Sequence, residues 1–413
     1  MALIVQKYGG SSVATAERIL NVARRVARTF EAGNQLAVVV SAMGDTTDEL
    51  IALARQITPN PDPRELDLLM STGETVSATL LSMALHTLGL PAVSLTASHA
   101  GIHTNAQHRR ALITAIKPDR VLRELEHGRI CIITGFQGLT EDGEVTTIGR
   151  GGSDPTAVAV AVALQASVCE FYKDVDGIFT ADPRVVGAAK KLDVISHEEI
   201  LELATLGAQV LHPRAVELGQ VYGMPLVVRS SFHDGPGTII RSEEDGMEQY
   251  NRVRGIANEA HVAKITVVGV PDRPGVAHRI FQPLADAGIN VDIIVQNVSH
   301  QGVTDMSFTV AEENVAQSQA LLEPVRAAIG ARVISSAGGY GKVSIVGTGI
   351  QSHPGYAARM FGTLSGAGIN IQMITTSDIR ITCLIDQQEV ERAARALHAA
   401  FIEESAEVVA PRA

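Results

Sequence analysis

The chain has 413 residues, with 34 lysines and arginines against 45 aspartates and glutamates, which gives a formal charge of −11. This length predicts two or three domains, and the acidic balance favours small-molecule or protein partners over nucleic acid. The 3 cysteines are far apart and form no metal-binding motif, as is typical of a reducing compartment. Neither a signal peptide nor a membrane-length apolar stretch is evident. We therefore expect a soluble, cytoplasmic protein that binds neither nucleic acid nor membrane.

The first 242 residues show strands alternating with helices. Short apolar runs predict strands at residues 3–6, 38–40, 92–95, 130–134, 168–171 and 226–229. Helical periodicity lies between them, at residues 19–30, 77–88 and 156–164. This pattern predicts an α/β domain over residues 1–242, with a mainly parallel sheet flanked by helices. In such sheets, ligands bind at the carboxyl ends of the strands.

A charged, glycine-containing segment at residues 243–260 predicts a linker, and an internal repeat follows it. The stretch DRPGVAHRIFQPLADAGINVDII is similar to SHPGYAARMFGTLSGAGINIQMI, with Pro274 matching Pro354 and Asn290 matching Asn370. Each copy follows a predicted strand and is followed by further strands and a second helix. We therefore expect two ferredoxin-like βαββαβ modules, at residues 261–337 and 338–413. They either fold in sequence or exchange a terminal strand.

The segment KYGGSS, residues 7–12, connects the first predicted strand to the first predicted helix. Its glycines allow close approach of the backbone to a ligand, its amides favour an anion, and Lys7 adds a positive charge. These features predict phosphate binding, although a glycine pair after a strand is often a simple turn. The sequence contains neither a Walker A motif nor a G-x-G-x-x-G fingerprint, which disfavours ordinary P-loop and dinucleotide sites.

Two further segments combine glycines with charged residues. GRGGSD, residues 149–154, precedes a predicted helix and supplies an arginine suited to a carboxylate and an aspartate suited to a lysine or a cation. Ser153 or Asp154 alone would cap the helix, so the glycines and Arg150 favour a functional segment. KDVDGIFTADPR, residues 173–184, either holds a nucleotide or forms a solvated turn. His212 precedes Pro213, which favours a structural role.

The motifs KYGGSS, VVVSAMGDTTDEL, STGE, GFQG, TTIGRGGSD and YKDVDGIFTADPR occur in the order and spacing of the amino-acid kinase family. The whole chain is similar to the aspartate kinases of that family, and the repeated modules resemble tandem ACT domains. The resemblance implies ATP-dependent phosphorylation of the side-chain carboxylate of L-aspartate to 4-phospho-L-aspartate. This reaction is the first step towards lysine, threonine and methionine, and the ACT modules imply feedback regulation.

The resemblance also implies the residues of each site. The residues expected at ATP are Lys7, Tyr8, Gly9, Gly10, Ser11, Ser41, Lys173, Asp174, Phe179, Thr180, Ala181, Asp182, Pro183 and Arg184. Those expected at aspartate are Thr47, Glu74 facing the ammonium, Arg150 facing a carboxylate, and Ser153. Lys7 and Asp154 are the expected catalytic residues, with Asp154 organising the phosphate-binding lysine. The effector, lysine or threonine or both, is expected at Asp272, Gly275, Ala277, Asn290, Val291, Asp292, Gln296, Asn370 and Ile371.

Elementary chemistry agrees with this reaction. The side chain of aspartate, with a pKa of about 3.9, is already a carboxylate at neutral pH, so no general base is required. The reaction needs ATP with Mg²⁺, alignment of donor and acceptor, and neutralisation of charge, without a metal held by the protein itself. The alternatives are a noncatalytic amino-acid sensor and a kinase for another acidic amino acid. A fusion to homoserine dehydrogenase is disfavoured, because the chain ends after the second module.

Met247 raises a separate hypothesis about partners. It precedes both modules, and the codons of Glu243 and Glu244 could form a ribosome-binding sequence just upstream. Translation from this methionine would give a shorter subunit that contains both modules and no kinase motif. We therefore expect a homo-oligomer or a hetero-oligomer that includes this subunit. The alternative is an ordinary linker methionine.

Overall fold

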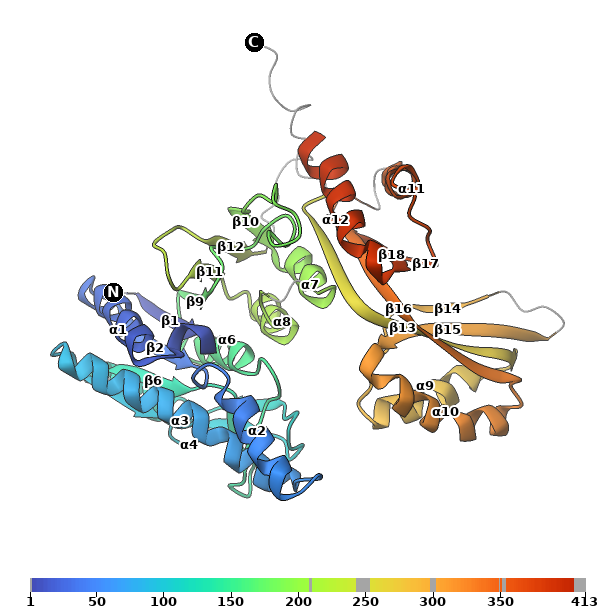
Figure 1. Cartoon of the computed structure of the whole chain (residues 1–413). Helices are drawn as coiled ribbons and strands as arrows, with labels where there is room; N and C mark the ends of the chain where they lie inside the picture. Colours follow the sequence, from blue (N-terminus) through green and yellow to red (C-terminus); the bar gives the residue numbers. More distant parts are fainter. Residues whose placement is uncertain are drawn as a thin grey trace, which may run out of the picture. The chain divides into compact units, whose positions relative to one another are not determined.

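The computed structural model describes residues 2–207, 210–242, 253–297, 302–348, 350 and 354–404 (Figure 1). Contacts within the chain divide it into two compact units. The first unit comprises Met1–Phe179, Lys191–Thr205 and Gln209–Gly246. The second unit comprises Thr180–Lys190, Leu206–Ala208 and Met247–Ala413.

An eight-stranded sheet forms the centre of the first unit. Its order is β10 (Val194–Ser196), β12 (Thr238–Arg241), β11 (Leu226–Ser230), β9 (Val168–Lys173), β1 (Leu3–Tyr8), β2 (Gln35–Val40), β6 (Ile130–Thr134) and β3 (Ala92–Leu95). All neighbouring pairs are parallel except β11 with β12. The side chains of β6 are buried throughout, as in a strand with both faces covered. The predicted, mainly parallel sheet is therefore confirmed.

Helices cover this sheet. They are the short 3₁₀ helix η1 (Gly10–Val13) and the α-helices α1 (Ala16–Glu31), α2 (Thr46–Ile57), α3 (Pro63–Thr87), α4 (Ala97–Ala100), α5 (Asp119–Glu126), α6 (Ser153–Ala163), α7 (His197–Thr205) and α8 (Pro213–Tyr222). The start of α3 follows from its sequence, because Asp62 accepts hydrogen bonds from the backbone of Arg64 and Glu65, and Pro63 occupies the first turn. From α3, Leu81 and Leu85 pack in the core that contains β2 and β6.

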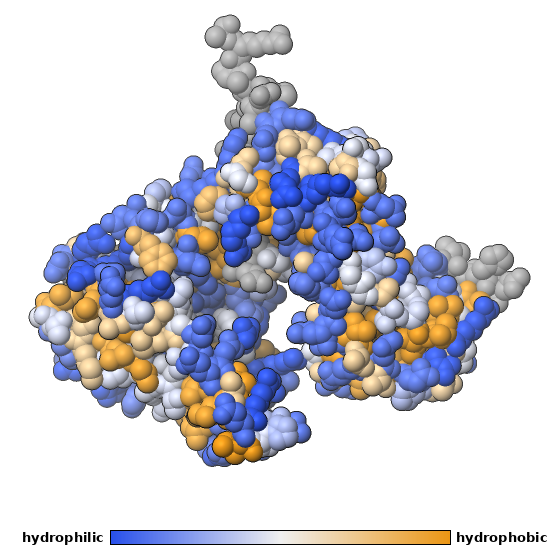
Figure 2. All heavy atoms as spheres, in the orientation of Figure 1, coloured by the Kyte–Doolittle hydropathy of each residue, from blue (hydrophilic) through white to orange (hydrophobic). Residues whose placement is uncertain are grey.

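By length and apolar composition, α3 would be able to cross a membrane, but 56% of the relevant segment is buried inside the protein. This burial identifies α3 as a core helix of the first unit. Its outer face nevertheless carries exposed apolar side chains, namely Leu68, Val76, Leu80 and Met83. Figure 2 shows hydrophobic surface over the part of the first unit where α2 and α3 lie.

A smaller four-stranded sheet belongs to the same unit. Its order is β5 (Ile113–Ile116), β4 (Ile102–Thr104), β7 (Gln137–Leu139) and β8 (Val145–Thr147). Strand β8 packs against α3 and ends where the GRGGSD segment begins. This sheet therefore carries the chain into the start of α6.

The second unit has one six-stranded antiparallel sheet, in the order β14-β15-β13-β16-β18-β17. Its elements follow the chain as β13 (Gly255–Pro271), α9 (Val276–Asp286), β14 (Ile294–Gln296), β15 (Val303–Ala311), η3 (Glu312–Asn314), α10 (Val315–Ile329), β16 (Val333–Val346), α11 (Tyr356–Gly366), β17 (Met373–Ser377), β18 (Arg380–Asp386), η4 (Gln387–Glu389), α12 (Val390–His398) and the π-helix η5 (Ala399–Glu403). The two repeated modules therefore share one continuous sheet.

The long strands β13 and β16 join the modules. The first part of β13, from Gly255 to Glu259, pairs with β16 from Val346 back to Lys342. The later part of β13 pairs with the beginning of β16, which belongs to the first module. The second module thus takes a strand from the segment that precedes the first module. Strand β13 also begins inside the expected linker at 243–260, so that range is wrong from residue 255 onwards, while Met247 lies outside the described residues.

One segment of the predicted kinase region belongs to the second unit. Thr180–Lys190 leaves the first unit directly after Phe179, and Ala181 and Val186 are buried in the core around α11 and α12. The backbone carbonyl of Thr180 accepts a hydrogen bond from Ile256 at 2.7 Å. Its hydroxyl lies 2.8 Å from the ring of His398. A domain boundary at residue 242 alone therefore describes the chain incompletely.

Candidate active site

Two lysines and one aspartate meet at the carboxyl ends of adjacent strands. Lys7 lies near the end of β1, Lys173 ends β9, and Asp154 lies in the first turn of α6. Lys7 Nζ is 2.6 Å from Asp154 Oδ1, and Lys173 Nζ is 2.8 Å from Asp154 Oδ2. The side chains of Lys7 and Asp154 are each only 4% exposed. The predicted partnership of Asp154 with a lysine is present, and a second lysine joins it.

The charges in this cluster do not cancel. Burial lowers the pKa of Lys7 to about 8, although the attraction of Asp154 works against that effect. Burial alone would raise the pKa of Asp154, but Lys173 and Lys7 together hold it well below its ordinary value. Asp154 therefore stays ionised and leaves one positive charge of the lysine pair without a counterion. A bound polyanion would supply that counterion and favour the charged form of Lys7.

The glycines after β1 permit close packing of the backbone. A side chain at Gly10 would place its Cβ 3.0 Å from the carbonyl oxygen of Ala42, and the Gly10 carbonyl accepts a hydrogen bond from Gly44 at 3.1 Å. The Lys7 ammonium lies beside the adjacent Gly9, because its Nζ is 3.8 Å from where a Cβ on Gly9 would be. The turn therefore brings glycine backbone next to a cation, an arrangement suited to phosphate binding.

A second buried carboxylate, that of Glu74 on α3, lies next to this turn. Its Oε1 accepts a hydrogen bond from the backbone of Ala42 at 3.1 Å, whereas its Oε2 is buried without a hydrogen-bond partner. Burial raises the pKa of Glu74 to about 8. Close by, the hydroxyls of Ser41 and Ser153 are 2.8 Å apart. An unpaired buried acceptor of this kind is suited to a ligand cation.

Arg150 is the second residue of the GRGGSD segment, and its side chain is 87% exposed. Its guanidinium pairs with Asp48 at 2.7 Å, so it reaches the first turn of α2, where Thr47 also lies. Gly149 and Gly151 flank it with φ angles of 95° and 76°. These left-handed conformations explain the glycines on both sides of the arginine.

Several expected ATP residues are placed differently. The ring of Tyr8 is fully buried and stacks on Tyr172 with 4.7 Å between centroids, so its side chain belongs to the core. Thr180 to Arg184 lie in the second unit, where Ala181 is part of the core. Asp182 and Arg184 form an ion pair with each other at 2.8 Å. Phe179 and the exposed Asp174 remain in the first unit.

The expected effector residues lie at the loops of the second unit. Exposed positions include Asp272, Gly275, Ala277, Asn290, Gln296 and Asn370, whereas Val291, Asp292 and Ile371 are half-buried. The carboxylate of Asp292 is 2.5 Å from Lys342 Nζ, which also pairs with Glu259 at 2.6 Å. Burial opposes the charge on Lys342, but these two carboxylates raise its pKa. Asp292 therefore already holds an ammonium group of the protein itself.

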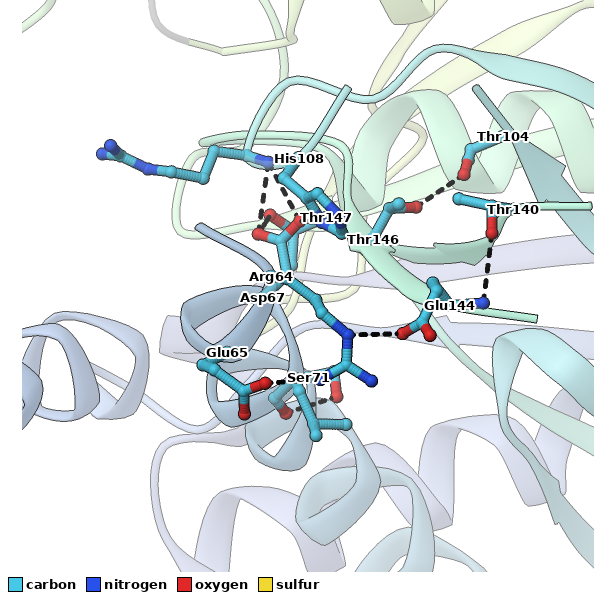
Figure 3. Close-up of polar contacts among 12 residues, drawn as sticks. Arg64, Glu65, Asp67, Ser71, Thr104, His108, Thr140, Glu144, Thr146 and Thr147 are labelled. Carbon is cyan, nitrogen blue, oxygen red and sulfur yellow. Dashed lines mark hydrogen bonds and ion pairs between the residues drawn. The ribbon is translucent and has the colours of Figure 1, made fainter. Parts of the chain in front are cut away.

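Sequence reasoning missed Asp67 on α3, which lies at the centre of a polar cluster (Figure 3). Its sequence signal is a charge between the buried apolar residues Leu66 and Met70.

His212 has the expected structural role, since its ring caps α8 by accepting a hydrogen bond from Arg214. Its backbone also donates to Asp154 at 3.3 Å, so it borders the site.

Comparison with known proteins identifies the family. The chain matches the amino acid kinase family over residues 2–230 and the ACT domain over residues 264–330 and 343–401. It is 49% identical to an aspartokinase of Mycolicibacterium smegmatis over 405 residues, which are 97% of this chain and 96% of that protein. The chain belongs to the aspartokinase family. An aspartokinase of Pseudomonas aeruginosa is 50% identical over 403 residues, 97% of this chain and 98% of that protein.

A solved structure of an aspartokinase supports the same conclusion. E. coli aspartokinase III in complex with aspartate and ADP, in the R-state, has a TM-score of 0.82 and 27% sequence identity. The match covers 96% of this chain and 99% of that one. The same E. coli enzyme in complex with lysine and aspartate, in the T-state, gives a TM-score of 0.74 at 27% identity over 97% of this chain and 99% of that one.

The raised pKa of Glu74 predicts how stability depends on pH. The folded protein holds the Glu74 proton up to about pH 8, against an ordinary value of 4.5, so the free energy of unfolding falls as pH rises through this range. Glu74→Gln carries no charge at any pH. At pH 8.5 we expect this variant to be more stable than the original protein by up to about 5 kcal/mol, since one pKa unit is about 1.4 kcal/mol.

Urea unfolding followed by circular dichroism at pH 5 and pH 8.5 measures this effect. Glu65→Gln, a 63% exposed glutamate on the same helix, is the control and should show no comparable pH-dependent gain. If Glu74→Gln changes the free energy of unfolding by the same amount at both pH values, the raised pKa of Glu74 is contradicted.

Proposed function

We propose that Lys7, Lys173 and the glycine turn bind the phosphates of ATP, while Glu74, Arg150, Ser153 and Thr47 bind L-aspartate. As a member of the aspartokinase family, the protein transfers the γ-phosphoryl group of ATP to the side-chain carboxylate of aspartate and forms 4-phospho-L-aspartate. The observation that carries the residue assignment is the buried carboxylate of Asp154 between two lysine ammonium groups. Asp154 holds both cations at the strand ends and leaves them a net positive charge.

The chemistry needs little beyond alignment and charge. The attacking group is a carboxylate that is ionised at neutral pH, so it needs no base, but it must approach an anionic phosphate. In the proposed site, Lys7 neutralises charge on the transferred phosphoryl group. Because Asp154 fixes its ammonium at 2.6 Å, this stabilisation requires little rearrangement during the reaction. The pKa of Lys7, near 8 without ligand, rises when the phosphates bind.

The proposed aspartate contacts divide by charge. Glu74 offers its unpaired Oε2 to the substrate ammonium, which would offset the cost of its burial. Arg150 exchanges its exposed partner Asp48 for a substrate carboxylate, for which its two-pronged geometry is suited. The hydroxyls of Ser41 and Ser153 lie between these regions and provide further donors.

Mg²⁺ enters this scheme as part of the ATP substrate. Mg²⁺ in kinase sites is bound by nucleotide phosphates, water and one or two carboxylates, and not by a complete protein cage. Among the residues that the structure describes, no group of three or more His, Cys, Asp or Glu side chains is placed to hold a metal ion. Asp154 is saturated by lysines, so a metal would reach the site with the nucleotide.

Lys7→Ala tests the catalytic assignment. We expect kcat to fall by about 100-fold or more, because the change removes charge stabilisation at the transferred group. Folding should persist, since Asp154 keeps its contact with Lys173. Trapping of the acyl phosphate with hydroxylamine measures turnover, with Lys117→Ala of the same unit as the control. Near-normal kcat in folded Lys7→Ala would contradict the assignment, and turnover of glutamate or N-acetylglutamate in place of aspartate would contradict the substrate.

We infer that effectors bind at the loops between the two ACT modules and act through the second unit. The E. coli aspartokinase III structure with lysine supports an amino-acid effector for this family. The Lys342 ammonium lies between Asp292 of the first module and Glu259 of the exchanged strand, so this position joins both modules. Thr180–Lys190 continues directly from Phe179 and packs in the core of the second module. That segment connects effector binding to the nucleotide region along the chain.

Asp272→Ala and Gln296→Ala test this regulation. Both residues are exposed in the first module, Asp272 in the loop after β13 and Gln296 at the end of β14. We expect the concentration of lysine, threonine or both that halves the activity to rise about tenfold, because a polar contact to a charged effector is lost. The uninhibited rate should stay within about twofold, and Asp286→Ala on α9 is the control. Full inhibition of both variants together with a reduced uninhibited rate would refute this effector site.

We propose a cytoplasmic oligomer, supported by three free, buried cysteines and by the exposed apolar residues of α3. We also propose that Met247 starts a shorter subunit. Such a subunit would lack Thr180–Lys190, so the surface that Ala181 and Val186 cover would be open to a partner. Expression of the natural gene with a carboxyl-terminal tag should give two tagged bands, and Met247→Leu should remove the shorter one. A single band from the natural gene would contradict this proposal.

A further inference from the structure

The carboxylate of Asp67 is a buried charged group that the proposed mechanism does not use. Its side chain is inaccessible to solvent, and it accepts hydrogen bonds from several donors (Figure 3). Thr147 donates its hydroxyl at 2.6 Å and its backbone N–H at 3.0 Å. Arg109 donates its backbone N–H at 2.9 Å, and His108 Nδ1 lies 2.9 Å away. This number of partners fixes both oxygens of the carboxylate.

These donors belong to two segments that meet at Arg150. Thr147 is the last residue of β8, and the chain continues from it through Ile148 and Gly149 to Arg150. Arg109 belongs to the loop before β5, and its carbonyl oxygen lies 3.0 Å from where a Cβ on Gly149 would be. The N–H of Ala111 in the same loop donates to the Thr147 carbonyl at 3.0 Å. Asp67 therefore ties α3 to Thr147, at the start of the arginine segment (residues 147–152), and to the loop that packs against Gly149.

Within the arginine segment, one backbone hydrogen bond closes the turn around Arg150, from the Gly152 N–H to the Gly149 carbonyl at 2.8 Å. Gly149 and Gly151 both adopt left-handed conformations, and glycine backbones are the most flexible. The Arg150 side chain is 87% exposed, and its partner Asp48 is itself 56% exposed. An ion pair of that exposure contributes little to order. The position of the guanidinium thus depends on the backbone behind it, which Asp67 anchors at Thr147 and which Phe136 and Arg214 contact at Ile148.

The conformation of Arg109 points to the same function. Its φ of 66° lies in the left-handed region, which costs a non-glycine residue about 1 kcal/mol. Such a conformation persists where surrounding contacts determine it, and the Arg109 N–H lies within 3.2 Å of both Asp67 oxygens. Strained residues that are held in this way concentrate at ligand-binding segments.

We propose that Asp67 is a positioning residue that fixes the arginine segment and so presents Arg150 to the carboxylate of the substrate. This inference rests on the proposed function, because it requires Arg150 to bind aspartate. Asp67 itself does not touch substrate. Loosening the arginine segment weakens aspartate binding, since Arg150 must then be ordered during binding. ATP binding is unaffected, because Lys7 and Lys173 are held by Asp154 and not by Asp67.

Asp67→Asn in the full chain tests the proposal, because an amide keeps the shape but has one acceptor oxygen fewer. We expect the KM for aspartate to rise about tenfold or more, with the KM for ATP changed by less than about twofold. Arg150→Lys sets the reference pattern, since a point charge replaces a two-pronged contact and should also raise the aspartate KM alone. The midpoint of thermal unfolding is measured for each variant.

A matched control exists between the same two elements. Arg64 of α3 pairs with Glu144, next to β8, at 2.7 Å on the protein surface. Glu144→Ala breaks this second connection between α3 and the β8 hairpin without touching Asp67, and Glu144→Gln removes its charge alone (Figure 3). Both KM values should stay unchanged in these variants. An aspartate KM that rises equally in Glu144→Ala would mean that any loosening of the hairpin has the effect, and it would overturn the specific role of Asp67.

Two variants of Thr147 test the proposal if Asp67→Asn fails to fold. Thr147→Val removes the 2.6 Å hydroxyl contact and keeps the carboxylate, whereas Thr147→Ser retains the hydroxyl. We expect a raised aspartate KM in the valine variant and rescue by serine. A lower unfolding midpoint with an unchanged aspartate KM in either Asp67→Asn or Thr147→Val would show a purely structural role and overturn the proposal. If the unsubstituted protein does not phosphorylate aspartate, the proposed function itself is refuted.

Discussion

The ion pairs of Asp154 with Lys7 and Lys173 determine the arrangement of the first unit's site. Lys7 lies near the end of β1 and Lys173 ends the neighbouring parallel strand β9, and their two ammonium groups would repel each other without an anion between them. The first turn of α6 places Asp154 there, and its ionised form is favoured by the helix start as well as by both lysines. The strand order, the helix start and the residual positive charge are therefore consequences of one contact. The negative charge of a bound phosphate chain would balance the positive charge that remains on the lysine pair.

The second unit depends on a different constraint, which is a shared sheet. Because β13 and β16 each serve both modules, a shift in one module alters the register at its junction with the other. Lys342 lies at that junction with carboxylates from both sides. Thr180–Lys190 packs in the same unit although its neighbours in sequence belong to the nucleotide motif. The chain is thus covalently continuous, through residues 179–180, between the first unit and the core of the second.

Sequence patterns predict the regular parts of this protein well. The buried strands β1, β2, β6 and β9 each contain a short apolar stretch, and the repeat indicates both modules, because these features are visible in the local sequence. The exchanged strand at residues 255–259 falls in the predicted linker, since this short stretch directly follows a charged segment and its pairing with the distant β16 is not visible in local composition. The resemblance implies that Phe179 to Arg184 lie at the nucleotide, and no local pattern indicates that Ala181 is buried in the second unit or that Thr180 contacts His398, more than 200 positions away. Asp67 was missed because its partners come together only in the folded chain.

The two buried carboxylates of the site show why their surroundings matter more than their burial. Asp154 and Glu74 are each 3% exposed, yet the pKa of Asp154 is lowered and that of Glu74 is raised to about 8. Two ammonium groups of the protein face Asp154, whereas Glu74 has one backbone N–H and an unpaired oxygen. A substrate ammonium at Glu74 would supply the positive charge that the lysines supply to Asp154. Binding would then ionise Glu74 and lower its pKa, so a side chain that is protonated in the empty site at neutral pH would become a carboxylate that attracts the substrate ammonium.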